Sequence, residues 1–331
     1  MTPAAGWARV GSAAVAAPAH DVITMGRIGA DIYPQSDGPL EGVTAFSRSL
    51  GGTATNVAVA AARLGRRTAV ITKVGDDPFG RYAVAALAGF GVDTRFVSST
   101  PDLPTPVVFA ELDPPEEPRI WFYRYPKAPD MMLAPPDLDP EAIRVAAIFW
   151  ATGTGLSDEP SLSATMEALA LRDPAATTVL DLDWRPVLWP DPALARDRYR
   201  AALRHASVVV GNRSEVAVAV GELEPDEAAA ALLALGPRLA VVKLGGQGVL
   251  VATEAGSEVV PPIRVEVVNG LGAGDAFGGA LCHRLLAGDD PAAAVRFANA
   301  AGAHVVARLA CADAMPTEAE VLELLEAAGA R

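Results

Sequence analysis

The sequence predicts an α/β fold in which a mostly parallel sheet lies between two layers of helices. Short runs of β-branched residues alternate with apolar helical patterns along most of the chain, which is typical of parallel strands joined by helices. The chain has 331 residues and is 51% hydrophobic, ample for a large core. No internal repeat or long linker interrupts it, so a single domain is expected.

The alternation starts with a strand-like run at 21–25 that ends at Gly26. Gly51 and Gly52 then open a helical pattern that ends near Leu64. The later strands of the parallel sheet are expected at 68–74, 145–150, 177–182, 207–210 and 238–244.

Several helices are predicted from the residues at which they begin. Asp77-Pro78 and Asp290-Pro291 each combine an N-cap aspartate with a proline in the first turn. Thr317-Glu318-Ala319-Glu320 predicts a capping box for the last helix.

Residues 1–19 are rich in Ala, Pro and Gly, with Arg9 as the single charge, and are expected to form a disordered N-terminal tail before a domain at 20–331.

The net charge and the cysteines limit the classes of partner and the compartment. A net charge of −13 and a pI near 4.8 argue against nucleic acid or an anionic membrane as partner. Cys282 and Cys311 lie in apolar helical patterns and indicate buried, reduced thiols in a cytoplasmic protein.

A glycine-rich stretch between a strand-like run and a helix carries the strongest chemical signal. The run at 265–268 leads to Gly272 and Gly274, where an apolar helical pattern begins. Free amides of Ala273, Gly274 and Asp275 at the start of this helix would favour an anion. The helix dipole would hold Asp275 as a carboxylate that can take a proton beside that anion. This arrangement favours phosphoryl transfer to a hydroxyl, with an ordinary glycine-rich turn as the simpler alternative.

Two other nucleotide-binding motifs do not fit this stretch. A dinucleotide fingerprint requires a third glycine where the sequence has Asp275 or Phe277. A P-loop requires a lysine directly after a glycine, and none of Lys73, Lys127 and Lys243 follows one.

Two motifs together resemble the signatures of the ribokinase-like (PfkB-type) carbohydrate kinases. Gly272-Ala273-Gly274-Asp275 is similar to the carboxy-terminal signature, and Gly51-Gly52-Thr53-Ala54-Thr55-Asn56 to the first one. They occur in the family's order, and the similarity extends from about residue 22 to the C-terminus. It implies a three-layer αβα sandwich, with a small β-lid formed by 32–47 and 104–125 over a sugar site. Without the resemblance, these two proline-interrupted segments would be taken for surface loops.

The resemblance also implies a role for individual residues. Asp275, with Gly272, Ala273 and Gly274, matches the catalytic base and the anion-binding amides. Asp31, Gly51, Gly52 and Asn56 match positions that bind the sugar. The ATP-binding positions would be Asn212, Lys243, Gly245, Gly248 and Asn299. From the residues alone, Gly245 to Gly248 equally fits a hairpin and Asn299 an ordinary helical asparagine.

Asn212 and Glu215 allow two interpretations that are compatible. Their spacing fits a capping pair at the start of a helix. They also resemble the Asn-x-x-Glu element with which these kinases hold Mg²⁺ near the phosphates, and one carboxylate suffices for a metal that keeps several waters.

Positive side chains in two segments predict a substrate with a carboxylate. Asp181-Leu182-Asp183-Trp184-Arg185 is similar to the Asp-x-Asn-x-Arg element of sugar-acid kinases, with Asp183 in place of the asparagine. The run 121–130, which contains Arg124 and Lys127, resembles that of kinases acting on 5-dehydro-2-deoxygluconate, a sugar acid of inositol catabolism. It is less similar to 2-keto-3-deoxygluconate kinases. Arginine can bind a carboxylate through two parallel hydrogen bonds.

The sequence therefore predicts an ATP- and Mg²⁺-dependent sugar-acid kinase. A catalytically silent sugar or nucleotide sensor on the same fold is the alternative from another class, and a fructokinase- or ribokinase-like activity is the alternative within the family. Many family members carry an aspartate six positions before the base, where this chain has Asn269, so weak potassium activation is expected. An exposed lid edge could pair two copies into a homodimer.

Overall fold

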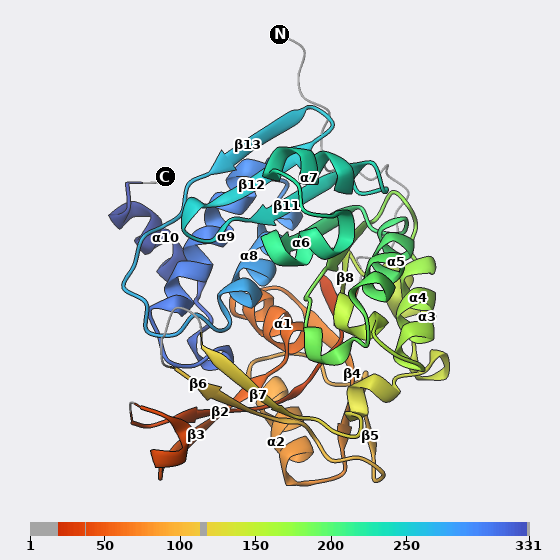
Figure 1. Cartoon of the computed structure of the whole chain (residues 1–331), viewed down its shortest axis with the longest axis vertical. Coiled ribbons are helices and arrows are strands. Elements are labelled where there is room, and N and C mark those ends of the chain that lie inside the picture. Colours follow the sequence, from red (N-terminus) through yellow and green to blue (C-terminus); the bar gives the residue numbers. More distant parts are fainter. Residues whose placement is uncertain (1–18, 37, 113–117, 330–331) are drawn as a thin grey trace.

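The computed structural model describes residues 19–36, 38–112 and 118–329 (Figure 1). The predicted tail at 1–19 lies outside them except for Ala19. A nine-stranded sheet forms the centre, in the order β13-β12-β11-β10-β9-β8-β1-β4-β5. Its strands from β11 to β5 pair in parallel, and β12 and β13 add an antiparallel edge. Their bounds are β1 Val22–Met25, β4 Thr68–Gly75, β5 Val97–Thr100, β8 Ile148–Thr152, β9 Thr177–Asp181, β10 Val208–Asn212, β11 Leu239–Lys243, β12 Val249–Thr253 and β13 Gly256–Val260.

Helices cover both faces of this sheet, as the sequence predicted. Helices α3 to α7 pack on one face, and α1, α8, α9 and α10 pack on the other (Figure 1). Most strands between them are buried on both sides, which explains their continuous runs of Val, Ile and Leu. The helices are α1 Thr53–Arg63, α2 Pro78–Gly89, α3 Pro140–Val145, α4 Ser161–Ala170, α5 Pro192–Leu203, α6 Arg213–Val220, α7 Pro225–Leu233, α8 Ala273–Ala287, α9 Pro291–Val306 and α10 Glu318–Ala327.

The predicted helix starts are confirmed by their caps. The Asp77 carboxylate accepts from the Gly80 amide, and the Asp290 carboxylate accepts from the first-turn amides of α9. Thr317 and Glu320 form the expected capping box. The strand predicted at 145–150 is shifted, however, because Asp139 caps a short helix through Val145 and the strand starts at Ile148.

A second, four-stranded sheet covers one end of the molecule in the order β3-β2-β6-β7 (Figure 1). Its strands are β2 Gly29–Pro34, β3 Phe46–Gly51, β6 Val107–Glu111 and β7 Arg119–Tyr123. The segments 32–47 and 104–125 fall within this lid sheet, but β2 and β3 extend beyond them. Gly29 pairs with Gly51, so the pairing continues to the residues that precede α1.

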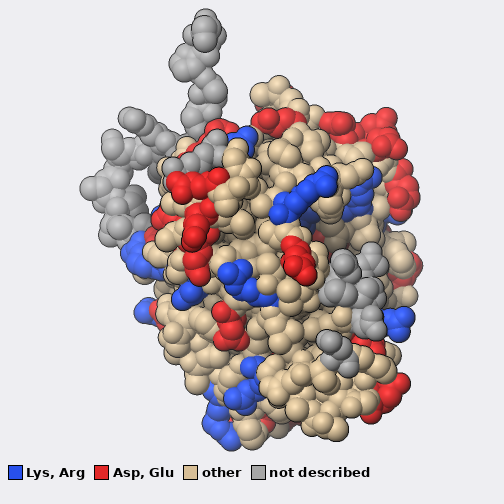
Figure 2. All heavy atoms as spheres, turned by 90° about the vertical axis from the view of Figure 1, so that its left-hand side faces the viewer, with Lys and Arg blue, Asp and Glu red and all other residues tan. Residues whose placement is uncertain are grey.

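Two further sequence expectations concern cysteines and surface charge. Cys282 and Cys311 are both buried and free, but Cys311 lies in a short turn after α9 rather than in a helix. On the face shown in Figure 2, basic side chains lie among acidic ones instead of in one continuous basic area. Within the described part of the chain, none of the helices is long and apolar enough to cross a membrane.

Candidate active site

The glycine-rich stretch forms a tight entry into α8. Gly272, the N-cap, has φ +80°, and a Cβ there would lie 2.7 Å from the Cys311 sulfur. A side chain at this position would therefore be strained and would clash. The amides of Ala273 and Gly274 donate to no backbone carbonyl among the described residues, whereas the Asp275 amide donates to the Gly272 carbonyl at 3.1 Å. The expectation of three free amides is wrong for Asp275, and two remain for an anion.

Asp275 lies in the first turn of α8 and faces α1. Its Oδ2 accepts a 2.8 Å hydrogen bond from Nδ2 of Asn56. Burial raises the pKa of Asp275 to about 6, and the Asn56 bond opposes that rise. The pKa of Asp275 is raised despite its place in the first turn of a helix, because desolvation disfavours the charged form more strongly than the helix dipole favours it. The Oδ1 atom of Asn56 is buried without a hydrogen-bond partner in the described structure, which leaves an acceptor for a ligand hydroxyl.

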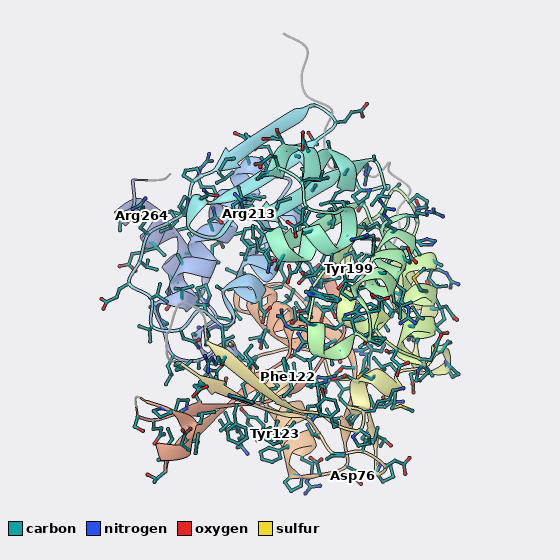
Figure 3. The ribbon with its side chains drawn as sticks, viewed as in Figure 1. Asp76, Phe122, Tyr123, Tyr199, Arg213 and Arg264 are labelled. Carbon is teal, nitrogen blue, oxygen red and sulfur yellow. The ribbon has the colours of Figure 1, made fainter. Side chains whose placement is uncertain are left out.

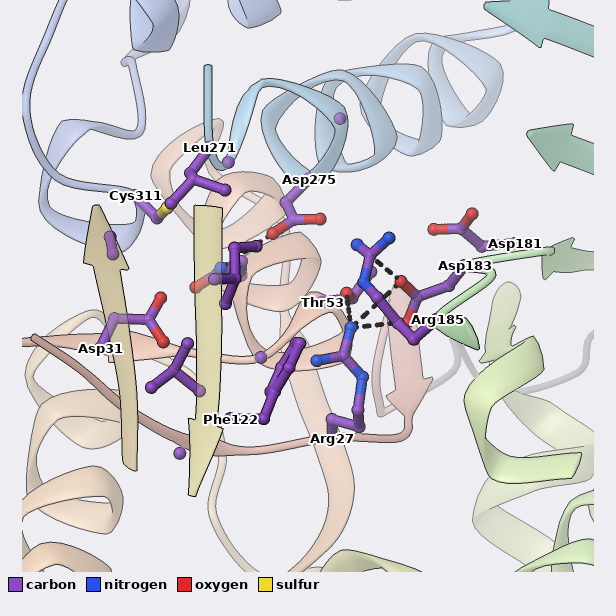
Figure 4. Close-up of a pocket in the computed structure, with 18 of the residues that line it drawn as sticks. Arg27, Asp31, Thr53, Phe122, Asp181, Asp183, Arg185, Leu271, Asp275 and Cys311 are labelled. Atoms are coloured by element: carbon purple, nitrogen blue, oxygen red, sulfur yellow. Dashed lines mark hydrogen bonds and ion pairs between the residues drawn. The ribbon is translucent and has the colours of Figure 1, made fainter. Parts of the chain in front are cut away.

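A cavity of about 320 Å³ opens in front of Asp275, between the main sheet and the lid (Figure 4). It collects side chains from the ends of several parallel strands, where α/β proteins bind their ligands. Among the predicted site residues, the cavity is lined by Asp31, Gly52, Asn56, Arg124, Arg185, Asn212, Glu215, Lys243, Gly272, Gly274 and Asp275.

The Gly51-Gly52 pair is explained by close approaches to this cavity. A Cβ on Gly51 would lie 2.0 Å from the carboxylate of Asp31. Gly52 has φ +106°, and a Cβ there would lie 2.3 Å from the Arg27 carbonyl oxygen. Burial and the nearby Asp275 raise the pKa of Asp31 to about 7.

A group of three charged side chains forms one end of the cavity. Asp183 is buried, has φ +37°, and lies between two guanidiniums (Figure 4). Arg27 Nη2 donates to both of its oxygens, at 3.0 and 2.8 Å, and Arg185 Nη2 lies 3.0 Å from Oδ1. Burial opposes ionisation of Asp183, but both arginines together hold its pKa below the usual value. Sequence reasoning missed Arg27, although its place directly after β1 at the carboxyl edge of the sheet was a usable signal.

The two cations predicted in the run 121–130 are placed differently from each other. Arg124 reaches the cavity, but its Nη2 forms a 2.6 Å ion pair with Asp130, and both side chains are 2% exposed. Lys127 does not line the cavity. Its ammonium lies 2.7 Å from Asp158 and donates to the Glu159 carbonyl, which directs it away from the site.

Carboxylates and a lysine lie beside Arg185, whose Nη1 is 3.9 Å from Glu215 Oε1. Asn212 and Glu215 form the predicted capping box, in which the backbone amide of Asn212 donates to Glu215 Oε2 at 2.7 Å. Burial raises the pKa of Asp181 to about 8, against the effect of Lys243. Lys243 is half-buried, and desolvation lowers its pKa, but the nearby carboxylates, Asp181 first, outweigh that effect and raise the pKa.

A second cavity, of about 650 Å³, lies on the other side of the start of α8. It shares Lys243 and Gly274 with the first cavity and is lined by Gly245, Gly248 and Asn299. The hairpin interpretation of Gly245 to Gly248 is confirmed, since β11 and β12 pair in antiparallel fashion around it. The Asn299 amide donates to the Pro261 carbonyl at 3.1 Å.

Comparisons with known proteins agree with this architecture. The profile of the pfkB family carbohydrate kinases matches residues 19–318. The chain is 31% identical to 5-dehydro-2-deoxygluconokinase of Shouchella clausii (strain KSM-K16), over 92% of this chain and 95% of that protein. It is 34% identical to Fructokinase-1 of Oryza sativa subsp. japonica, over 93% and 98%.

Solved structures share the fold as well. The fructokinase of Xylella fastidiosa with bound ATP superposes with a TM-score of 0.82 at 29% identity, covering 94% of this chain and 99% of that one. The family expected from the two glycine motifs is thereby confirmed. The chain belongs to the pfkB family of carbohydrate kinases.

Proposed function

We propose that the chain transfers the γ-phosphoryl group of ATP to the primary hydroxyl of a sugar acid, with 5-dehydro-2-deoxy-D-gluconate as the first candidate. One observation carries the reaction: two cavities meet at Gly274 and Lys243, with the half-buried Asp275, the proposed base, facing the smaller one. This arrangement allows a sugar and a nucleotide to approach each other across the two free amides of Ala273 and Gly274.

In this proposal, Asp275 accepts the proton of the attacking hydroxyl. The hydroxyl oxygen forms a bond to the γ-phosphorus as the bond to the ADP oxygen breaks. The amides of Ala273 and Gly274, with the ammonium of Lys243 nearby, stabilise negative charge on the transferring group. Phosphoryl transfer depends mainly on such positioning and electrostatic stabilisation.

The second cavity is the proposed nucleotide site, and the residues near its junction with the first cavity fit Mg²⁺. Hard oxygen ligands suit this metal, and Asp181 and Glu215 both line the first cavity, as does Lys243, which the two cavities share. Asp181 makes no hydrogen bond to another described side chain, and burial, followed by the neighbouring carboxylates, raises its pKa against the effect of Lys243. Glu215 and Asp181 would hold the metal, directly or through water. The Asn212 amide oxygen already accepts from Glu215 and Ser214. When bound, Mg²⁺ would neutralise charge on the ATP phosphates.

The choice of a sugar acid rests on the three arginines that line the first cavity, Arg27, Arg124 and Arg185. A neutral sugar needs hydrogen bonds but no fixed cation. The similarity to several 5-dehydro-2-deoxygluconokinases supports the same choice and would place the enzyme in myo-inositol catabolism. Because Fructokinase-1 proteins are at least as similar in sequence, fructose is the second candidate.

A substrate panel tests the proposal. Purified protein with ATP and Mg²⁺ would be assayed for ADP release with 5-dehydro-2-deoxygluconate, 2-keto-3-deoxygluconate, fructose and ribose. We expect the highest kcat/KM for the first acid. Higher values for fructose or ribose would overturn the sugar-acid assignment, and absence of turnover with every sugar would favour the sensor alternative.

We also propose that two copies pair through the outer face of the lid. Phe122 and Tyr123 of β7 project to opposite faces of the lid sheet (Figure 3), and Phe122 lines the cavity. The outer face carries Trp121 and Tyr123, which are 52% and 66% exposed. An aromatic surface beside an edge strand is suited to association with a second copy of itself.

A further inference from the structure

Arg27 lies at the end of the first cavity, the proposed sugar site, and keeps one donor free at the cavity wall. Its Nη2 donates to Thr53 Oγ1 at 2.6 Å and to Asp183, and its Nε donates to Thr154 Oγ1 at 3.3 Å. Its Nη1 makes no hydrogen bond to any described residue and is not among the buried unpaired atoms. Figure 4 shows the guanidinium between Asp183 and Phe122, at the wall of the cavity. The side chain is thus fixed on one side and open to a ligand on the other.

The three arginines differ in their partners. Arg185 lies between two carboxylates, 3.0 Å from Asp183 and 3.9 Å from Glu215, whereas Arg27 pairs with Asp183 alone among the described carboxylates. Arg124 has its own buried partner, Asp130, and its unpaired Nε is buried. A carboxylate that approached Arg124 would have to compete with Asp130 for the guanidinium.

Asp31 lines the same cavity, but it opposes an incoming carboxylate less than a fully ionised group would. Burial raises its pKa to about 7, which reduces its negative charge near neutral pH. Asp183 lies between its two arginines, 2.8 Å from Arg27 and 3.0 Å from Arg185. Of these two arginines, Arg27 is the one that pairs with no second carboxylate among the described residues.

We propose that Arg27, together with Arg185, binds the carboxylate of the substrate, and that Asp183 holds the two guanidiniums in place for it. This inference rests on the proposed sugar-acid kinase activity and makes Arg27, rather than Arg124, the residue that decides acid against neutral substrate. Thr53 and Thr154 hold the Arg27 guanidinium in place by hydrogen bonds, so little side-chain freedom is lost when the carboxylate binds. The replacement of the family asparagine by Asp183 then has a reason, since a carboxylate is needed to hold a second arginine there.

The test compares an acid with its neutral analogue in matched variants. Wild type, Arg27→Gln, Arg27→Lys and Arg124→Gln would be assayed with 5-dehydro-2-deoxygluconate and with its primary amide, and kcat/KM would be measured for each. Arg27→Gln is expected to lower kcat/KM for the acid by about ten- to a hundredfold, the effect of losing a charge-assisted hydrogen bond. The value for the amide should change by less than about threefold. Arg27→Lys, which keeps the charge but loses the fork, should show a smaller loss for the acid.

Two controls separate a binding role from a structural one. Thermal unfolding reports folding, and Arg27→Gln is expected to fold because Asp183 keeps Arg185 and Thr154 as partners. Arg67→Gln removes an exposed arginine that pairs with Asp21 and should leave both substrates unaffected. Arg124→Gln should affect acid and amide alike, since its partner is Asp130.

The outcomes distinguish this inference from the proposed function. Equal losses for acid and amide in Arg27→Gln, or a loss confined to the acid in Arg124→Gln, would overturn the role of Arg27 while the kinase activity stood. A wild-type enzyme that phosphorylated the amide as well as the acid, or only neutral sugars, would overturn the sugar-acid assignment itself. If Arg27→Gln did not fold, Arg27→Lys would take its place. A ratio of kcat/KM for the acid to kcat/KM for the amide below that of wild type would support the role of Arg27, and an unchanged ratio would overturn it.

Discussion

At the scale of single residues, Asp275 combines a half-buried position with a pKa of about 6, and this pKa sets the pH dependence expected of the reaction. A general base works in its deprotonated form, so kcat/KM should fall as pH drops through about 6 and level off above it. Asp275→Asn should lower kcat by a factor on the order of 10²–10⁴ across this range. Initial rates from pH 5 to 8 would measure both effects. Near-normal turnover in the folded variant would contradict the assignment.

Asp275→Asn should also change the stability of the protein, and its unfolding temperature is the control for its loss of activity. The folded-state pKa of Asp275 lies above the ordinary value of 3.8 for an aspartate, so its charge costs stability at pH 7, and the cost disappears below about pH 4. Asp275→Asn should therefore unfold at an equal or higher temperature than wild type at pH 7. A lower unfolding temperature would indicate that lost activity reflects damage to the fold.

Glu215 serves both a helix cap and the proposed metal site. In Glu215→Gln, the side-chain amide oxygen of the glutamine can still accept the capping hydrogen bond from the Asn212 backbone amide, but the negative charge that attracts Mg²⁺ is gone. The Mg²⁺ concentration for half-maximal rate should rise several-fold, as measured by a titration at fixed ATP. An unchanged titration curve would exclude a metal role for Glu215, with Asp181 as the remaining candidate.

At the scale of elements, the loop before α8 is tied down by Asn269. This side chain is fully buried, donates to the Leu309 carbonyl at 2.5 Å and accepts from the Leu271 amide at 2.9 Å. Both of its polar groups are thus occupied, and an amide is a weaker ligand for K⁺ than a carboxylate. We expect replacement of Na⁺ by K⁺ at fixed ionic strength to change the rate by less than about twofold. A several-fold gain with K⁺ would show that the loop binds the cation without an aspartate.

The helix that carries Asp275 is positioned by close packing against α1. A Cβ on Gly279 of α8 would lie 2.4 Å from the Ala60 methyl group and 2.7 Å from the Ala61 amide. Gly279→Ala should therefore lower the free energy of unfolding by about 1–3 kcal/mol through overpacking. It should also reduce kcat, because a shift of α8 moves the base. Urea denaturation and initial rates measure the two effects.

Gly89 of α2 offers a matched control for this substitution. It is also a helical glycine, but a Cβ there would meet nothing within 4 Å. Gly89→Ala should stabilise the protein by about 0.4–1 kcal/mol through lower entropy of the unfolded chain. Destabilisation by both substitutions alike would show that close packing of α8 is not the cause.

At the scale of the whole molecule, the lid sheet lies between the first cavity and the molecular surface. One face of this sheet places Phe122 in the cavity, and the opposite face presents Trp121 and Tyr123. Rings of Phe46, Phe109 and Tyr123 form edge-to-face contacts at centroid distances of 5.6 and 5.5 Å on the outer side. A second copy on this surface would restrict the lid directly above the substrate.

The proposed dimer is tested by its mass in solution. Wild type should run as a dimer in light scattering coupled to size-exclusion chromatography, and the double variant Trp121→Ser, Tyr123→Ser should run as a monomer. Val259→Ser removes an apolar side chain, 50% exposed, from β13 and should leave the dimer intact. A monomeric wild type at micromolar concentration, or a double variant that remains dimeric, would exclude pairing through the lid.

Local chemistry was sufficient to predict much of this protein from its sequence. Helix starts at Asp77, Asp290 and Thr317 depend on hydrogen bonds between near neighbours, and all three were predicted. The parallel sheet followed from strand-like runs alternating with helical patterns, and the family followed from two glycine motifs. These motifs predict backbone geometry directly, because glycine allows positive φ angles such as those of Gly52 and Gly272.

What the sequence left open depends mostly on contacts between residues far apart in the chain. The contact of Lys127 with Asp158 and the place of Arg27 between Asp183 and Phe122 join distant segments. Asp130 is only six residues from Arg124, but their pairing depends on a turn that no local pattern predicted. The pKa of Asp275 likewise depends on burial, which no local pattern reports. Sequence alone thus determined the fold and the family, and it predicted Asp275 as the base. Only the tertiary structure decided which arginine keeps an unpaired donor at the cavity wall, because a donor is available only where neighbouring groups do not already bind it.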